Sequence, residues 1–279
     1  MDFDNIIAKV SEQAAAHAGT DAEDYEENGL LHCGKCHTPK QCYIELFGQV
    51  RKPHCLCKCA KEKLEREEQE RKQREQALRV QKYRAAAFPE SEMAKWTFAA
   101  DDGSNERLSN AMQNYVKHFG QMRAEGKGLL LFGPVGTGKT FLASCVANAL
   151  IDSGVPCMVT KFSRIANTMQ GLFDGKQQYL DSFNKFPLLV LDDLKTERNT
   201  PYMNEIVYDV IDSRYRAGLP LIVTTNLTRE ELMHPADIAD QRIISRLFEM
   251  CTPIEVAGKD RRKEALKSNI AATKQLLGL

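Results

Sequence analysis

The chain has 279 residues, of which 43% are hydrophobic and 27% charged, and its 38 basic side chains balance 38 acidic ones. Such a composition is typical of a globular protein, and zero net charge predicts no overall attraction to nucleic acid or to a membrane surface. The first residues lack the basic start and apolar core of a signal peptide, and no apolar stretch approaches the roughly 20 residues that span a bilayer. We therefore expect a cytoplasmic protein with no membrane partner.

The first region, residues 1–30, is acidic: it holds eight Asp and Glu side chains and the single base Lys9. Its pattern predicts one helix from Phe3 to Ala18, followed by an acidic stretch.

Residues 31–60 hold six of the nine cysteines, and we interpret this region as a zinc-binding module. In a cytosolic chain, clustered cysteines favour metal ligation over disulfides. Two pairs of thiolates about twenty residues apart can meet around a tetrahedral zinc ion if a hairpin, here expected over residues 43–48, reverses the chain between them. The favoured ligands are Cys33, Cys36, Cys57 and Cys59. Cys55 is the first substitute and Cys42 is left spare; a patch of reduced cysteines without metal is the alternative.

Residues 61–88 are dense in Lys, Arg, Glu and Gln and contain neither Pro nor Gly. Acid-to-base pairs at i,i+4 spacing, such as Glu68–Lys72 and Glu70–Arg74, favour a solvated helix. Its few apolar residues do not sustain a heptad pattern, so a helical linker is favoured over a coiled coil.

Residues 89–279 alternate short apolar strands with helices, which predicts an α/β domain with a parallel sheet covered by helices on both faces. The expected strands are 128–132, 156–162, 188–191, 221–225 and 253–256. The expected helices are 141–152, 162–173, 176–183, 202–217 and 237–250.

A glycine-rich run between the first strand and the first helix of this domain has the pattern of a phosphate loop. It consists of Gly133, Pro134, Val135, Gly136, Thr137, Gly138, Lys139 and Thr140. Glycines allow consecutive N–H groups to point at an anion, Lys139 suits the β- and γ-phosphates, and the Thr140 hydroxyl suits Mg²⁺. The run predicts a site for ATP with magnesium.

Two later strands end in polar side chains that would complete this site. Asp192 and Asp193 follow the apolar run 188–191. Asp192 is expected to hold Mg²⁺ opposite Thr140, and Asp193 to act as general base toward the attacking water. Asn226, after the strand 221–225, could reach the γ-phosphate or its water; capping of the following turn is the alternative.

Together, the phosphate loop, the strand ending in Asp192 and Asp193, and the run Pro220–Asn226 resemble the AAA+ ATPases of the DnaC/DnaI helicase-loader group and their IstB-like relatives. The resemblance covers roughly residues 95–265. It implies that Asn226 is the sensor 1 residue and that Arg246 is an arginine finger acting on a neighbouring subunit. The alternative is that Arg242 and Arg246, at i,i+4 spacing on a helix, are solvated surface charges. The resemblance also implies a sensor 2 arginine at Arg262, with Arg261 as the alternative, and places adenine near Trp96.

The resemblance further implies what the protein does. It predicts an ATPase that binds a replicative DNA helicase through its zinc module, associates with itself through the ATP sites, and loads the helicase onto single-stranded DNA. Contacts with DNA are expected around residues 161–164, Lys176 and Tyr179. The alternatives are an IstB-like transposition helper and a zinc-ribbon nucleic-acid-binding protein whose nucleotide is only a switch.

Overall fold

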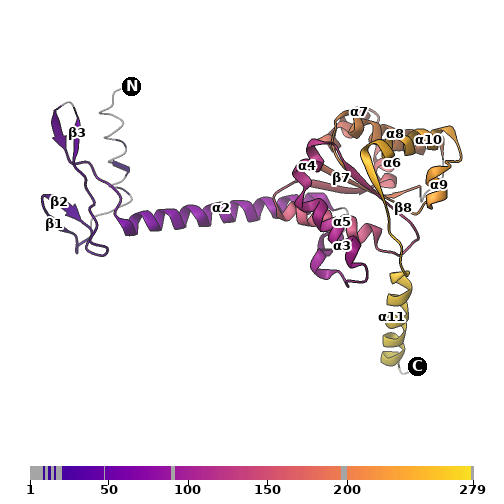
Figure 1. Cartoon of the computed structure of the whole chain (residues 1–279), viewed down its shortest axis with the longest axis horizontal. Coiled ribbons are helices and arrows are strands. Elements are labelled where there is room, and N and C mark those ends of the chain that lie inside the picture. The colour runs from indigo at the N-terminus through magenta and orange to yellow at the C-terminus, as the bar shows by residue number, and fades with distance from the viewer. Residues whose placement is uncertain are drawn as a thin grey trace. The chain divides into compact units, whose positions relative to one another are not determined.

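The computed structural model describes residues 21–46, 48–88, 92–195 and 200–277, together with residues 9, 12, 13 and 16. The helix expected from Phe3 to Ala18 therefore lies mostly outside the described residues. The chain divides into two units, Met1–Leu78 and Arg79–Leu279. The division falls inside the long helix α2 (Lys58–Ala87), which belongs to both units (Figure 1).

The first unit contains two short antiparallel hairpins. They are β1 (Tyr25–Glu27) with β2 (Leu30–His32), and β3 (Ile44–Leu46) with β4 (Gln49–Arg51). Between β1 and β2, Asn28 and Gly29 have φ angles of 53° and 73°, the left-handed conformations that a tight two-residue turn requires. The hairpin expected over residues 43–48 is present as β3 and β4. Because each hairpin reverses the chain, segments on either side of it can meet.

Helix α2 is solvated along most of its length, and i,i+4 ion pairs such as Glu68 with Lys72 lie on its surface. In its last turns, however, Val80 and Tyr83 are partly buried and Ala87 is fully buried, and all three pack in the core of the second unit. The helix expected to be a linker is thus a linker only in its first part.

The second unit is built on a five-stranded parallel sheet with the order β6-β7-β8-β5-β9. The strands are β5 (Gly128–Phe132), β6 (Cys157–Lys161), β7 (Leu188–Leu194), β8 (Leu221–Thr225) and β9 (Cys251–Glu255). All five expected strands are present, although β7 ends later and β9 begins earlier than expected. The predicted α/β fold with a parallel sheet is confirmed.

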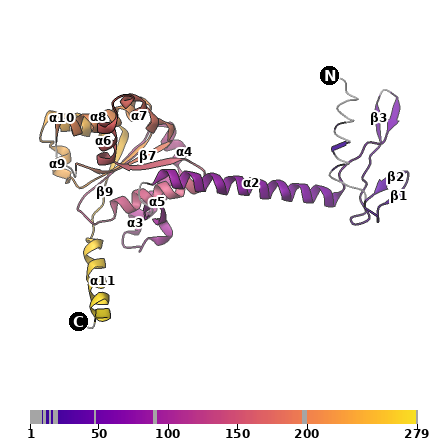
Figure 2. The same ribbon diagram turned by 180° about the vertical axis from the view of Figure 1, so that it is seen from behind.

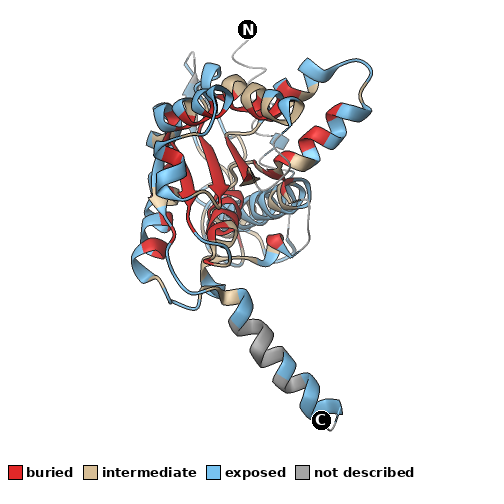
Figure 3. Ribbon diagram, turned by 90° about the vertical axis from the view of Figure 1, so that its right-hand side faces the viewer, coloured by how far each residue is buried: buried red, intermediate tan, exposed pale blue. Residues whose placement is uncertain are grey.

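Helices cover both faces of this sheet. One face carries α6 (Phe162–Gly171), α7 (Lys176–Ser182), α8 (Pro201–Arg216) and α10 (Ile238–Met250). The other carries α3 (Glu106–Lys117), α4 (Phe119–Ala124) and α5 (Lys139–Asp152). Figure 2 shows α6, α7, α8 and α10 on one side of the sheet and α3 and α5 on the other. Along β5, Leu130 and Phe132 face the first core while Leu129 and Leu131 face the second, so the strand is buried on both faces (Figure 3).

Shorter elements complete the second unit. They are the 3₁₀ turns η1 (Met93–Lys95), η2 (Phe98–Ala100) and η3 (Phe183–Lys185), and the helices α9 (Arg229–Met233) and α11 (Arg261–Leu277). Helices α3, α4, α9 and α11 have no counterpart among the predicted elements. Within the described ranges of the chain, none of the helices combines the length and apolar character required to cross a membrane.

Candidate functional site

The phosphate loop, residues 133–140, connects β5 to α5. Gly133, Gly136 and Gly138 have φ angles of 128°, 80° and 96°, in the left-handed region that glycine occupies most readily. At Gly136 space is limiting as well, because a Cβ atom there would lie 2.0 Å from Asp260 Oδ1. Helix α5 begins at Lys139, so its first N–H groups belong to the loop. The loop has the geometry that cradles an anion.

Lys139 is enclosed by this loop. Its ammonium group donates hydrogen bonds to the carbonyl oxygens of Gly133 (2.8 Å) and Pro134 (2.7 Å), and the residue is 6% exposed. Burial lowers the pKa of Lys139, against the opposite influence of the nearby carboxylates Asp193 and Asp192. Because the ammonium is partly desolvated, water screens its attraction for a phosphate group less than it would at the surface.

Asp192 lies at the centre of a buried hydrogen-bond cluster. Its Oδ1 accepts hydrogen bonds from the hydroxyl groups of Thr140 (2.8 Å) and Thr224 (2.6 Å), and the residue is 2% exposed. Burial raises the pKa of its carboxyl group, although both hydroxyls favour the ionised form. A carboxylate beside a hydroxyl is a donor set that suits Mg²⁺, so the expected pair of magnesium ligands is brought together.

Thr224 is a residue of this site that the sequence analysis does not include. Besides donating to Asp192, its hydroxyl accepts a hydrogen bond from the backbone N–H of Asp193 (3.0 Å). Strand β8 lies between β5 and β7, so polar residues at its end lie between the phosphate loop and the two acids. A buried threonine at the end of an apolar strand is the signal that points to it.

A pocket of about 680 Å³ opens beside the loop. Its lining comes from the phosphate loop and the start of α5, from the ends of β7 and β8, from the segment after η1 and from the start of α11. The lining residues are Trp96, Val135, Gly136, Gly138, Lys139, Thr140, Phe141, Asp193, Asn226, Arg261 and Arg262. Gly133, Pro134, Thr137 and Asp192 are neighbours of these residues in the chain but do not belong to the described lining. Asp193 has a φ of 63°, which is unusual for a residue with a side chain and frequent at functional sites.

Trp96 is fixed at one side of this pocket. Its ring lies 6.2 Å from that of Phe141, measured between centroids. The buried side chain of Asn148 on α5 donates hydrogen bonds to the carbonyl oxygens of Met93 (3.0 Å) and Trp96 (2.9 Å), which anchors the segment. The expected position of Trp96 near the nucleotide is therefore compatible with the geometry.

The two arginines at the start of α11 make different contacts. Arg261 donates a hydrogen bond to Ser104 Oγ (2.5 Å) and lies 3.3 Å from Asp102 Oδ1, so its guanidinium group holds a neighbouring turn. Arg262 is exposed and lines the pocket, as Arg261 does. Arg261 also lies against the phosphate loop, since a Cβ atom at Gly138 would be 3.5 Å from its guanidinium carbon, so the geometry leaves both arginines as candidates for meeting a phosphate.

Arg246 lies on α10, outside the described lining of the pocket. It contacts Asp212, Tyr215 and Glu249. An arginine that acts on a neighbouring copy need not reach the pocket of its own chain, so this location is compatible with the expected role.

In the first unit, the favoured zinc ligands come together. The thiol sulfurs of Cys33, Cys36, Cys57 and Cys59 all lie within 4.8 Å of one another. Although burial opposes it, hydrogen bonds lower the pKa of Cys36 to about 5, whereas neighbouring thiols raise the pKa of Cys59 to about 12. Thiols this close cannot all ionise without a cation between them, and four thiolates form the donor set of structural zinc. The residues fit a zinc ion.

The acidic turn before this cluster belongs to the same module. Asp24 accepts a hydrogen bond from the backbone N–H of Gly34 (3.1 Å) and pairs with Lys40 at 2.5 Å, and both side chains of the pair are less than 5% exposed. At Gly34 a Cβ atom would lie 2.3 Å from the carbonyl oxygen of Glu23. The acidic turn is therefore packed against the segment that carries the first cysteines.

The residues expected to contact DNA divide into two groups. Phe162 is 3% exposed, so its ring cannot stack on a base, whereas Tyr179 is partly buried and packs beside Phe183. Arg164 and Lys176 are partly or fully exposed, and Phe173, between α6 and α7, is fully exposed at 101%. Phe173 is not among the expected residues because exposure of an aromatic ring cannot be inferred from its neighbours in the chain.

A parallel sheet of this order, with a phosphate loop after β5 and acids at the end of β7, defines a P-loop nucleotide-binding protein. Residues 57–269 match the family described as IstB-like ATP binding protein, and the chain belongs to this family. The resemblance inferred from the motifs is confirmed.

Several curated proteins are similar to this chain. The replicative helicase loader DnaI of Bacillus subtilis is 24% identical over 173 residues, which cover 58% of this chain and 55% of DnaI. The replicative helicase loader DnaC of Escherichia coli is 26% identical over 150 residues, 52% of this chain and 58% of DnaC. An insertion-sequence ATP-binding protein of Mycobacterium tuberculosis is 28% identical over 166 residues, 58% of this chain and 66% of the relative. The chain thus matches just over half to two thirds of each relative's length.

Two solved structures share the fold. A crystal structure of the DnaC helicase loader superposes with a TM-score of 0.52 at 26% identity, covering 60% of this chain and 100% of that one. A crystal structure of DnaI superposes with a TM-score of 0.53 at 22% identity, covering 64% of this chain and 98% of that one.

Proposed function

We propose that this protein is an ATP-dependent loader that binds a replicative DNA helicase and places it on single-stranded DNA. The observation that carries the proposal is the presence, in one chain, of a P-loop ATP site and a four-cysteine cluster ahead of it. Relatives named as helicase loaders support it, although they match over only part of their length.

At the ATP site, each expected residue has a role that its chemistry allows. The backbone N–H groups of residues 133–140 and the Lys139 ammonium bind the phosphates, and Arg262 meets the γ-phosphate. Thr140 and Asp192 hold Mg²⁺, which neutralises phosphate charge. Asp193 accepts a proton from the attacking water, which Asn226 orients. Because Asp193 is one methylene shorter than glutamate, we expect slow hydrolysis.

Hydrolysis is completed between copies of the chain. Arg246 of one copy enters the ATP site of the next, where its planar, permanently charged group stabilises the charge that develops on the transferred phosphoryl group. Self-association through the ATP sites follows from this role.

The helicase and the single-stranded DNA are bound away from the ATP site. The zinc module, held by Cys33, Cys36, Cys57 and Cys59, binds the helicase. Single-stranded DNA is bound along α6 and α7, where Phe173 offers a ring for stacking and Arg164 and Lys176 offer positive charge.

Affinity purification of the tagged full chain from its native cell, with ATP present, tests the proposal. We expect a replicative helicase to be recovered, and we expect ATP hydrolysis by the purified protein to be lost in Lys139→Ala. Absence of any complex with a replicative helicase, with or without ATP, would overturn the loader function.

A second candidate is a transposition helper, which the insertion-sequence relative favours. Recovery of a transposase in place of a helicase would establish it. A third candidate, a zinc-ribbon nucleic-acid-binding protein with a nucleotide switch, is excluded if the wild-type chain hydrolyses ATP and Lys139→Ala does not.

A further inference from the structure

Arg246 is held in one position by contacts on two helices. Its Nε lies 3.5 Å from Asp212 Oδ1 on α8, and its Nη1 lies 3.5 Å from Glu249 Oε2 on α10. Its guanidinium carbon lies over the ring of Tyr215, 4.3 Å from the centroid. The side chain is 32% exposed, so a long and flexible arginine is partly ordered on the surface of its own chain.

Asp212 is the more buried of the two carboxylates that contact Arg246. Its side chain is 15% exposed, and its second oxygen, Oδ2, lies 2.9 Å from Arg216 Nε. Both oxygens are therefore engaged, and the carboxylate presents a fixed acceptor to Arg246. Glu249 is 47% exposed and three residues away on the same helix, a kind of pair that orders a side chain weakly.

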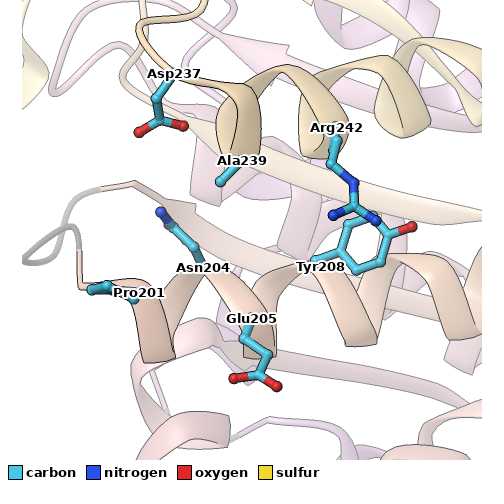
Figure 4. Close-up of a pocket in the computed structure, with 7 residues that line it drawn as sticks. All are labelled: Pro201, Asn204, Glu205, Tyr208, Asp237, Ala239 and Arg242. Atoms are coloured by element: carbon cyan, nitrogen blue, oxygen red, sulfur yellow. The ribbon is translucent and has the colours of Figure 1, made fainter.

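Arg242, one turn earlier on α10, provides an internal comparison. Its guanidinium carbon lies over the ring of Tyr208, 4.7 Å from the centroid, beside a pocket of about 430 Å³ between α8 and α10 (Figure 4). Both arginines are thus stacked on tyrosines of α8. They differ in their ion pairs: within the residues that the structure describes, Arg246 pairs with a carboxylate of α8, that of Asp212, whereas Arg242 pairs with no carboxylate of that helix.

We propose that Asp212 is a positioning residue that holds Arg246 ready to enter the ATP site of a neighbouring copy. This inference rests on the proposed role of Arg246. A side chain ordered before assembly loses less conformational entropy when the shared site forms, so more of the contact energy is available to the transition state. Loss of Asp212 then lowers hydrolysis in the assembly and leaves the chain's own ATP pocket unchanged.

The first test is Asp212→Asn, which removes the negative charge of the side chain and keeps its shape. In the assembled full chain we expect kcat to fall roughly tenfold, a loss typical of a misplaced group rather than a missing one. Nucleotide affinity of the unassembled chain should not change, and Asp212→Glu should recover part of the rate. The matched control is Glu205→Gln, an exposed acid two turns earlier on α8, which should hydrolyse ATP like the wild type. A rate for Asp212→Asn at or above that of the wild type would overturn the inference.

The second test mixes variants. The Asp212→Asn variant keeps an intact ATP pocket but has a poorly positioned Arg246, whereas the Lys139→Ala variant has a defective pocket and a correctly positioned Arg246. In a mixture, Arg246 of the second variant can act on the pocket of the first, so hydrolysis should exceed that of either variant alone. If Asp212→Asn instead loses nucleotide affinity, and the mixture does not regain hydrolysis, then the substitution acts by misfolding the chain and the inference is overturned.

Mixing Arg246→Ala with Lys139→Ala separates this inference from the proposed function. If that mixture is not restored, the role of Arg246 between copies is wrong. If it is restored while Asp212→Asn behaves like the wild type, Arg246 keeps its role and only the positioning by Asp212 fails.

Discussion

Two ionisable residues of the ATP site are buried, and burial shifts the pKa of each in the direction that favours its neutral form. Burial raises the pKa of Asp192 and lowers that of Lys139. A buried charge costs folding free energy unless its partners compensate fully. The site therefore keeps charges where a magnesium nucleotide needs them, at some cost to the stability of the unliganded domain.

This cost predicts the effect of Asp192→Asn. Because burial raises the folded-state pKa of Asp192 above its ordinary value, the ionised group destabilises the fold at neutral pH. This cost declines once the pH falls below the raised pKa and is gone below the ordinary one. We expect the variant to melt a few degrees higher at pH 7, to lose this advantage in acid, and to lose magnesium-dependent ATP binding. Calorimetry with and without nucleotide measures both effects. The exposed Asp174→Asn should change neither, and a lower melting temperature for Asp192→Asn would contradict the reasoning.

Trp96 provides an optical measure of the same site. It is the single tryptophan of the chain and lines the pocket, 6.2 Å from the ring of Phe141. Binding of ATP should change the environment of its indole ring, so we expect the intrinsic fluorescence to shift or be quenched on titration with ATP and magnesium. Lys139→Ala should abolish the response. An unchanged fluorescence spectrum in a chain shown to bind ATP would mean that the adenine ring does not lie near Trp96.

At this scale, residues that belong to a motif were predictable, even where the parts of the motif meet through the fold as Thr140 and Asp192 do, and residues outside any motif were not. The phosphate loop and the acids after β7 carry their chemistry in local order. Thr224 joins them only because β8 lies between β5 and β7. The difference between Arg261 and Arg262 depends on Ser104 and Asp102, which are distant in sequence.

Among the elements, α8 is connected to the start of two strands by one buried arginine. Arg214 is fully buried and donates hydrogen bonds to the carbonyl oxygens of Phe183 (3.2 Å), Phe186 (2.9 Å), Pro187 (3.3 Å) and Pro220 (2.5 Å). Pro187 and Pro220 directly precede β7 and β8, whose other ends provide Asp192 and Asn226. Burial lowers the pKa of Arg214 to about 10, which leaves it charged at neutral pH.

Arg214→Met should therefore destabilise the second unit strongly. The substitution removes the donors for four carbonyl groups, each of which costs about 1–3 kcal/mol when left unpaired, with partial relaxation. Because the structure relaxes around these carbonyl groups only in part, we expect a loss of roughly 3–5 kcal/mol in the free energy of unfolding. Urea denaturation measures it. Arg216→Met, on the same helix, removes an exposed side chain whose ion pair with Asp212 should contribute less than about 1 kcal/mol, and an equal loss in both variants would contradict this account.

Strands β5, β7 and β8 were predictable because each is a short apolar run buried on both faces, whereas the edge strand β9 is largely exposed and only its approximate position was predicted. Helix α9 has only five residues, too few for a periodic pattern. The burial of Val80, Tyr83 and Ala87 at the end of α2 depends on where that helix meets the second unit, which its charged composition does not reveal.

The whole molecule combines two units that are stabilised differently. The second has a sheet with an apolar core on each face. Within the described residues from 21 to 57, the buried positions are Cys33, Lys40 and Cys57, of which two belong to the four-cysteine cluster. A region of this size without an apolar core requires another source of stability, and zinc bound by four thiolates can supply it.

Removal of the proposed zinc ion should therefore affect the first unit and leave the second unchanged. After treatment of the full chain with a strong chelator, we expect the clustered thiols to react with a thiol reagent and helicase capture to be lost, because the module unfolds. The Trp96 response to ATP should persist, since the second unit has its own core. Cys33→Ser should reproduce the effect without chelator, whereas Cys42→Ser, outside the cluster, should retain one zinc ion per chain and bind the helicase. Helicase capture that survives both chelation and Cys33→Ser would show that the metal is not what holds the binding surface together.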